Sequence, residues 1–168
     1  WFQEPLSAIW ARVDANGQII NVVTAHLGLG PRERELQVQA LLSSEWLGDI
    51  IEREPILLCG DFNALPGSRP YRMAAAKLRD VQMANPAHRP LGTFSSMQPL
   101  VRLDHIFTTK HFATMKVTVV RNDLTRVASD HLPLMADLQV GPSSADTSTT
   151  TRQKSPEHTE PAQPVGTG

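Results

Sequence analysis

Four short segments of the chain concentrate carboxylates, amides and imidazoles, the groups that move protons and bind phosphate or metal ions. Each segment comes at the expected end of a strand, where the loops of α/β folds assemble their sites. The segments are TAHLG (24–28), GDFNA (60–64), RLDHIF (102–107) and ASDHLPL (128–134). Together they supply six candidate residues: His26, Asp61, Asn63, Asp104, Asp130 and His131.

This set of residue types suits the hydrolysis of a phosphate ester. Such a reaction needs a histidine, held in one tautomer by a carboxylate, that deprotonates a water molecule near neutral pH. The phosphoryl oxygens need donors such as an imidazolium or an amide, together with a hard cation. Mg²⁺ prefers oxygen ligands, whereas Zn²⁺ requires more histidines or cysteines than these segments bring. We therefore expect Mg²⁺ as the cofactor, with Mn²⁺ as the alternative.

Each segment alone also has a purely structural interpretation. GDFNA could be a strand followed by a turn with an Asx cap, and the Asp130-His131 pair could cap a strand. His26 could be an ordinary polar residue. Asp104 is harder to dismiss, because an unpaired carboxylate in an apolar strand is costly and a neighbouring imidazole would relieve that cost. His105 should point to the opposite face of its strand and is left out of the site.

Three further side chains are weaker candidates for a role in catalysis or substrate binding. Ser129 precedes the Asp130-His131 pair, but consecutive residues cannot all aim at one point, so this run argues against a serine-hydrolase triad. Thr93 and Phe94 could line a substrate pocket, although a phenylalanine in such a loop more often closes the edge of a core.

Turn formers and the spacing of apolar residues indicate the elements that position the four segments. A two-residue Asn-Gly turn predicts a hairpin of 7–14 with 18–27. Apolar residues at near-helical spacing predict a helix between Pro31 and Pro55. The run PILLCGDF is short and continuously apolar, as expected of a strand buried on both faces. A second helix is expected at 69–79, and further strands at 102–108, 116–122 and 133–140.

The order β-β-α-β-α-β-β-β predicts an α/β (α+β) fold with a mixed β-sheet and flanking helices. The 168 residues suffice for one domain with a real core, and the apolar and charged contents of 40% and 20% are those of a globular protein. From Gly141 the composition shifts to Ser, Thr and Pro, which predicts a disordered tail. We therefore expect a domain at 1–140 and a tail at 141–168.

Charge and hydropathy exclude some functional classes. The net charge of −1 and the lack of a basic block argue against broad attraction to a phosphate backbone. No apolar stretch approaches the ~20 residues that cross a bilayer, and no signal peptide is visible. Because the chain begins with Trp1, a preceding segment could carry a signal, and a cytoplasmic location is only favoured.

The four segments, in this order and at these intervals, resemble the endonuclease/exonuclease/phosphatase superfamily of metal-dependent phosphoesterases. The matching motifs are TAHL, GDFNA, LDHIF and SDHLPL. The run HLGLGPRERELQ also looks like a bacterial small-phosphatase or phospholipid-associated branch, in which a His-Leu-Gly-Leu turn precedes Glu-Arg-x-x-Gln on a helix. Glu33, Arg34 and Gln37 fill those places, and the resemblance covers roughly residues 5–140.

The resemblance implies a role for each candidate residue. His131 would activate the attacking water or contact the scissile phosphate, with Asp104 orienting its ring. Asp61 and Asn63 would lie at the centre of the site and hold the nucleophilic water, the phosphate and a metal ion. The two remaining candidates would be a metal ligand, direct or through water, and a second acid or phosphate donor: Asp130 and His26.

The resemblance is to the C-terminal half of the family's fold, which is a four-layer α/β/β/α sandwich. The half that supplies an early Asn and a Gln-Glu pair, whose Glu is the principal magnesium ligand, has no counterpart here. Gln3-Glu4 looks like that pair but lies too close to His26, and it fits better as a loop. Without the partner sheet, one face of the sheet would be exposed. That face would carry Ile20, Val22 and Leu57.

The sequence therefore predicts a metal-dependent phosphodiesterase or phosphatase that acts by water attack. It is expected to be incomplete without the N-terminal half of the same domain, its expected partner. The alternative is a truncated, catalytically inactive relative that binds a partner through the exposed face. A phospholipid head group, a small phosphodiester and a nucleic acid all remain open as substrates. A nucleic-acid-binding module ranks low, because no basic stretch carries interleaved aromatic residues.

Overall fold

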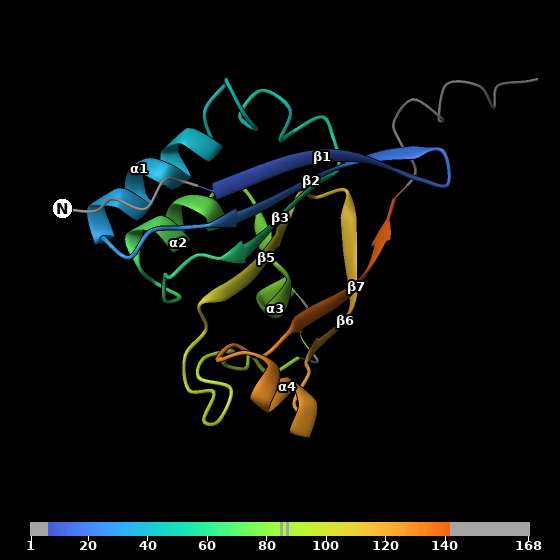
Figure 1. Ribbon diagram of the computed structural model, residues 1–168. Coiled ribbons are helices and arrows are strands. Elements are labelled where there is room, and N and C mark those ends of the chain that lie inside the picture. The colour runs from blue at the N-terminus through green and yellow to red at the C-terminus, as the bar shows by residue number, and fades with distance from the viewer. Residues whose placement is uncertain (1–6, 85, 87, 142–168) are drawn as a thin grey trace, which may run out of the picture.

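Strands and short helices alternate along the part of the chain that the structure, a computed structural model, describes: residues 7–84, 86 and 88–141 (Figure 1). In chain order the elements are β1 (Ser7–Ala15), β2 (Gln18–His26), α1 (Pro31–Leu41), β3 (Ile56–Asp61), α2 (Arg69–Ala75), β4 (Arg79–Asp80), α3 (Val81–Ala84), β5 (Asp104–Thr108), β6 (Phe112–Val119), α4 (Asp123–Ala128) and β7 (Leu134–Val140).

The predicted hairpin joins β1 to β2, which pair antiparallel over their full length. Asn16 and Gly17 link the strands with φ angles of 57° and 88°, both left-handed, as two-residue hairpin turns require. The Gly17 amide also donates a hydrogen bond of 2.6 Å to the Asp14 carboxylate. The Asn-Gly signal therefore predicted this turn correctly.

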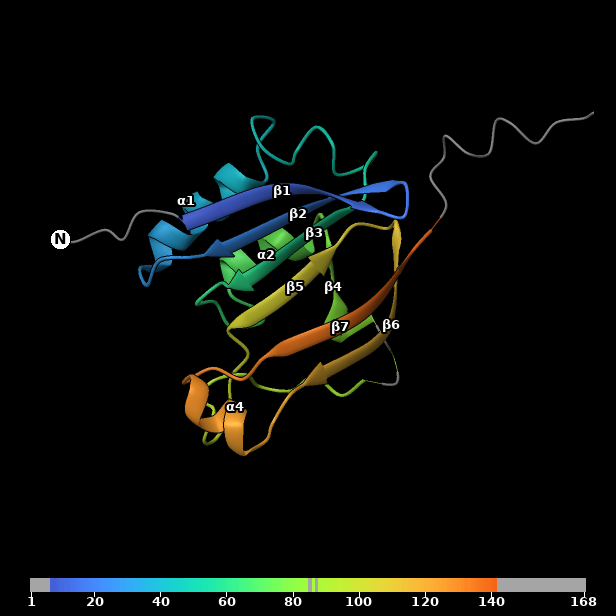
Figure 2. The same ribbon diagram turned by 45° about the vertical axis from the view of Figure 1, so that its right-hand side comes forward.

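Five strands form one mixed sheet in the order β1-β2-β3-β5-β4. β2 and β3 are parallel, and the other pairs are antiparallel. A parallel pair needs a crossover connection, and α1 lies in that connection. Strands β6 and β7 form a separate two-stranded antiparallel sheet, with α4 in the connection between them, and β7 runs beside β5 in both views (Figures 1 and 2). The predicted mixed sheet with flanking helices is confirmed.

Helices α1 and α2 pack on one face of the sheet and form the core with it (Figure 2). Strand residues on this face, such as Val23, Leu58 and Phe107, are fully buried. Val38 of α1 and Ala74 of α2 are buried against the same cluster. Alternate side chains of a strand point to opposite faces, so this packing also decides which residues are left on the other face.

The other face of the sheet carries apolar side chains that the helices do not cover. Ile9 is 67% exposed and Val13 is 45% exposed, and both lie on β1 at the edge of the sheet. Ile20, Val22 and Leu57 are half-buried, because their cross-strand neighbours shield part of each side chain. An uncovered apolar face was expected here, but its central residues are less exposed than a bare sheet would leave them.

The first helix is much shorter than its apolar spacing predicted. α1 ends at Leu41, and consecutive turns follow it to residue 53. The Leu47 amide bonds to the Leu41 carbonyl and the Gly48 amide to the Ser43 carbonyl, so the chain folds back and buries Leu47 without a helix. Leu36, one of the apolar residues at near-helical spacing, is 51% exposed.

Other boundaries differ from the predictions for local reasons. The second helix ends at Ala75, because the following residues 79–80 leave it to form β4 along β5. The strand expected at 116–122 begins earlier, at Phe112, because it pairs with all of β7. The short helix α4 was not predicted, although Asn122 caps it with a reciprocal bond to Thr125.

Two parts of the sequence analysis fall mostly outside the described residues. Of the tail expected at 141–168, the structure describes only Gly141, whose amide bonds to the His111 carbonyl. The Gln3-Glu4 pair also lies outside. Among the described residues, none of the helices is both long and apolar enough to cross a membrane.

Candidate active site

Three strand ends meet at one edge of the sheet and carry the candidate residues there. Asp61 ends β3 and is the ladder partner of Asp104, which begins the antiparallel strand β5. His26 ends β2, which runs parallel to β3, so both strands finish at the same edge. The Leu27 amide bonds to the Asp61 carbonyl at 2.9 Å and holds the two ends together. GDFNA is thus apolar within the sheet and polar where it reaches this edge.

The loop before β7 brings His131 onto Asp104. The imidazole Nδ1 lies 2.8 Å from Asp104 Oδ2, so Nδ1–H donates to the carboxylate and fixes the ring's tautomer. Nε2 then faces Asp61, whose Oδ2 is 3.8 Å away. The ring of Phe94 packs against the imidazole with 5.0 Å between centroids. The expectation that His131 and Asp104 meet is confirmed.

The pKa of His131 lies above its ordinary value. Partial burial alone would lower this pKa, because it disfavours the charged ring. The hydrogen bond and charge of Asp104 outweigh burial, and the charges of Asp61 and Asp130 act in the same direction. The ring is therefore protonated more readily than a free histidine, which suits a group that both accepts a proton and contacts a phosphate.

Asn63 and His26 lie on the other side of Asp61. Asn63 Nδ2 donates to the Leu27 carbonyl at 2.8 Å and lies 3.3 Å from His26 Nε2. His26 Nε2 is also 3.5 Å from Asp61 Oδ2. One nitrogen cannot accept from the amide and donate to the carboxylate at once, so the tautomer of the His26 ring selects its partner. The His26 side chain is 61% exposed and stands at the rim.

The turn interpretation of GDFNA is also present in the structure. The backbone N–H of Asn63 donates to Asp61 Oδ1 at 2.8 Å, and Asn63 has a left-handed φ of 46°. This Asx turn leaves Asp61 Oδ2 facing His131 and His26. The structural and functional interpretations therefore describe the same loop.

Asp61, Asp104 and His131 form the group of described residues that could hold a metal ion, with ligand atoms within 4.8 Å of one another. Two carboxylates and an imidazole are a donor set that divalent cations accept. The Asp130 carboxylate is outside this group: its side chain is exposed and lies 3.5 Å from the Ser129 hydroxyl. Its role as a metal ligand stays a prediction.

His105 lies behind the site and not in it, as the strand alternation predicted. The ring is buried, and its Nε2–H donates to the Ala64 carbonyl at 2.8 Å, at the end of GDFNA. Phe62, Phe107 and Tyr71 surround it. Burial lowers the pKa of His105, so the ring stays neutral and keeps this bond. Sequence reasoning missed this support, because a contact with a backbone carbonyl leaves no pattern in the chain.

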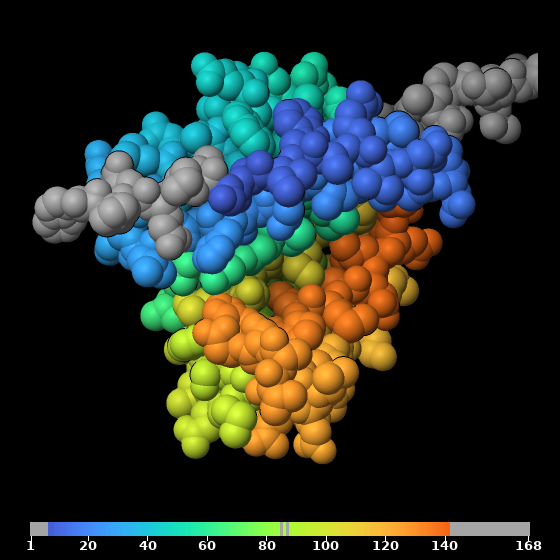
Figure 3. All heavy atoms as spheres, viewed as in Figure 1, coloured from blue at the N-terminus to red at the C-terminus, as the bar shows by residue number. Residues whose placement is uncertain are grey.

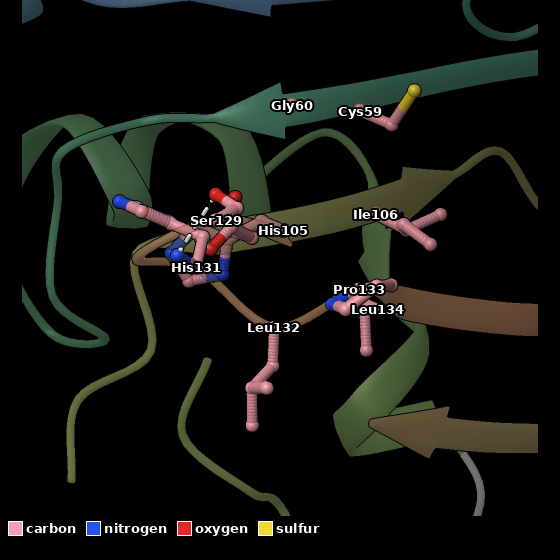
Figure 4. A pocket seen from close by; sticks show the side chains of 10 residues that line it. Cys59, Gly60, His105, Ile106, Ser129, His131, Leu132, Pro133 and Leu134 are labelled. Atoms are coloured by element: carbon pink, nitrogen blue, oxygen red, sulfur yellow. Dashed lines mark hydrogen bonds and ion pairs between the residues drawn. The ribbon is translucent and has the colours of Figure 1, made fainter. Parts of the chain in front are cut away.

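Two hollows flank the cluster on the uncovered face of the sheet. One, of about 410 Å³, is lined by Cys59, Ile106 and Leu134 and reaches His131 at one end (Figure 4). The other, of about 300 Å³, is lined by Ile9 and His26, among others. In the space-filling view the first appears as a depression between the sheet and the segment that leads into β7 (Figure 3). The candidate residues thus border an open, partly apolar depression.

The comparison with family profiles matches residues 3–131 to the Endonuclease/Exonuclease/phosphatase family. Among curated proteins, the chain is 32% identical over 124 residues to the uncharacterized protein YbhP of Escherichia coli K12. That alignment covers 74% of this chain and 48% of YbhP. The chain therefore spans about half the length of the curated relatives it matches.

Solved structures show the same fold. A functionally unknown conserved protein from Enterococcus faecalis V583 aligns with a TM-score of 0.69 and 26% identity, over 79% of this chain and 56% of that one. A mannosyl-6-phosphatase from Bacteroides thetaiotaomicron VPI-5482 aligns with a TM-score of 0.64 and 19% identity, over 79% and 56%. At such identity the second likeness concerns the fold alone.

Proposed function

The chain belongs to the Endonuclease/Exonuclease/phosphatase family, and from this premise we propose that it forms the catalytic half of a metal-dependent phosphodiesterase or phosphatase. The observation that supports this most is the convergence of Asp61, Asp104 and His131 from three separate segments. The Asp104–His131 pair alone, which is half-buried, could be structural. A third ionisable group, facing the free nitrogen of the histidine, is an arrangement that proton transfer uses.

Each side chain of the site has a separate role when water attacks the phosphate. Asp104 binds Nδ1–H of His131, so Nε2 carries the lone pair that accepts a proton from water. The raised pKa of His131 makes the ring a better base and stabilises the imidazolium that results. On the other side of the site, His26 donates a hydrogen bond to a phosphoryl oxygen. The amide nitrogen of Asn63 is engaged by the Leu27 carbonyl, so its amide oxygen is the atom left to face the metal or the attacking water.

Mg²⁺ is the proposed metal, with Mn²⁺ as the alternative, because with His131 and Asp104 engaged with each other the remaining ligands are oxygens, which hard cations prefer. Asp61 would hold it, with the amide oxygen of Asn63 and, through water, Asp130 as further oxygen ligands. The bound ion would lower the pKa of water and neutralise phosphate charge. Because one direct carboxylate is a sparse ligand set, we expect the remaining protein ligand to come from the N-terminal half of the domain.

The uncovered sheet face supports that N-terminal half as the partner. Ile9, Val13 and Ile20 leave apolar surface there, and such a face is normally buried by a second sheet. The chain aligns with only about half of the length of its curated relatives, which also supports an N-terminal half as the partner. The same observations also favour the second candidate function, a catalytically inactive relative that uses this face to bind a partner.

The test is the release of p-nitrophenol from bis-p-nitrophenyl phosphate, with and without Mg²⁺, by the protein that includes the N-terminal half. The proposed function predicts Mg²⁺-dependent turnover that His131→Ala lowers by roughly 10²-fold or more. The 168 residues alone should show little or none. If the complete protein shows no turnover with Mg²⁺ or Mn²⁺, the inactive alternative replaces this proposal. Phospholipid head groups, small diesters and nucleic acid can then be compared in the same assay.

A further inference from the structure

The Glu-Arg-x-x-Gln motif on α1 has no place in the chemistry above, although it lies close to the site. We propose that Gln37, supported by Glu33 and Arg34, is a positioning residue that sets the direction of the Asn63 amide beside His26. The proposal rests on the proposed function, since it assumes that Asn63 and His26 act on the substrate.

Gln37 is buried and uses both ends of its carboxamide. Only 8% of the residue is exposed. Its Oε1 accepts a hydrogen bond of 2.8 Å from the Gly28 amide, and its Nε2 donates to Glu33 Oε1 at 3.3 Å. A buried amide that is satisfied at both ends holds one orientation, because turning it would leave a buried polar atom without a partner.

The neighbours of Gln37 hold the same stretch of backbone. Arg34 Nη1 donates to the carbonyls of Gly28, at 3.3 Å, and Leu29. The Glu33 carboxylate packs so closely on Gly28 that a Cβ atom there would lie 2.2 Å from Glu33 Cδ. Side chains of α1 therefore bind both the N–H and the C=O of Gly28 and hold the backbone that follows His26.

The geometry of one peptide bond carries this constraint to the site. The Gly28 amide and the Leu27 carbonyl belong to the same peptide unit, whose N–H and C=O point in opposite directions. Gln37 binds the N–H, so it also aims the Leu27 carbonyl, which accepts from Asn63 Nδ2 at 2.8 Å. The amide nitrogen of Asn63 is thereby held toward Leu27 and His26, and its oxygen is left for the substrate or metal.

The first test replaces Gln37 by a residue of similar shape without hydrogen-bonding groups. In Gln37→Met, the Gly28 amide should exchange its hydrogen at least about tenfold faster, and the side-chain amide signals of Asn63 should shift in ¹H–¹⁵N spectra. Gln39→Met makes the same change on the exposed side of α1 and should alter neither signal. Unchanged Asn63 signals in a folded Gln37→Met protein would overturn the proposal.

The second test is a reciprocal exchange that separates positioning from loss of stability. Gln37→Glu alone places two carboxylates together and should disturb Asn63, whereas Glu33→Gln with Gln37→Glu restores both hydrogen bonds and should return its signals. In the complete enzyme, Gln37→Met should lower kcat roughly 10- to 100-fold with little change in KM, and the double exchange should recover it. If the Asn63 signals of the double variant stay as disturbed as those of Gln37→Glu, the positioning role of Gln37 is refuted.

These readouts also separate the two proposals. Wild-type protein without turnover, combined with an Asn63 shift in Gln37→Met, would refute the proposed function and leave the positioning of Asn63 intact. Turnover in wild type that Gln37→Met leaves unchanged would refute the positioning role alone.

Discussion

At the scale of residues, the site depends on two carboxylates that lie on either side of the His131 ring. Asp104 binds one ring nitrogen and Asp61 faces the other, and the two come from neighbouring strands, β5 and β3, that pair at this edge of the sheet. The sequence predicted these contacts because each polar group lies at or next to one end of an apolar strand. It could not predict the contacts of Gln37 or His105, which reach backbone atoms across space.

Replacing the partner carboxylate should change the titration of His131. In Asp104→Asn the charge that raises the pKa of His131 is gone, so this pKa should fall, as the histidine signals in an NMR titration would show. The maximal rate should fall by roughly 10²- to 10⁴-fold, because the ring loses its fixed tautomer and its counter-charge. Asp137→Asn, an exposed change on β7, is the control. An unchanged or raised pKa would contradict this account of His131.

Acid should destabilise the fold partly through His105. Burial lowers the pKa of His105 below the ordinary value of 6.5. Just below that pH, the histidine of the unfolded chain is therefore protonated while the native ring is still neutral. Stability is therefore present above about pH 6.5 and is lost as the pH falls below it. His105→Gln keeps a donor for the Ala64 carbonyl but does not titrate, so its melting temperature should fall less between about pH 7.5 and about pH 5.5. Equal acid losses in wild type and variant would rule out this source, and His88→Gln serves as the comparison.

At the scale of elements, turn chemistry was predictable and helix length was not. Asn16 and Gly17 determine their turn by backbone conformation alone, so the local sequence suffices. Leu47 and Ile51 have the spacing of a helix, yet a series of turns buries them equally well. Apolar periodicity reports which residues are buried, and it leaves open which backbone buries them.

The junction of β2 and β3 should tolerate no side chain at Gly60. Its φ is +136°, and a Cβ atom there would lie 2.0 Å from the Ala25 carbonyl oxygen of the neighbouring strand. Gly60→Ala should therefore lose more than about 3 kcal/mol in denaturant unfolding. Gly67→Ala has a similarly positive φ of +85° but open space, and it should lose only about 1–2 kcal/mol. Similar losses in the two variants would show that the close strand approach is unimportant.

At the scale of the whole molecule, the sheet has one packed face and one unpartnered face, and the candidate site lies at the edge of the second. The alternation of the strands made both faces predictable, and the family resemblance indicated which one a second sheet would cover. The local sequence did not predict that β6 and β7 pair in a separate two-stranded sheet, because strand pairing depends on distant partners and not on local pattern.

The unpartnered face should make the chain associate with itself when the N-terminal half is missing. Val13 and Ile20 are cross-strand neighbours on this face, and burying each apolar side chain contributes about 1.5–3 kcal/mol. Val13→Lys with Ile20→Lys should weaken self-association by at least about tenfold in sedimentation experiments. Val127→Lys, on α4, removes an 80% exposed valine elsewhere and should have little effect. A monomeric wild-type chain would argue against an incomplete sandwich.

The most direct measurement is metal-dependent hydrolysis of bis-p-nitrophenyl phosphate by the protein with its N-terminal half, compared between wild type, Asp61→Asn and His131→Ala. We predict turnover that requires Mg²⁺ or Mn²⁺ and falls by roughly 10²-fold or more in each variant, because both side chains act on the same water and phosphate. Turnover that persists undiminished in both variants would contradict a site built on Asp61, Asp104 and His131.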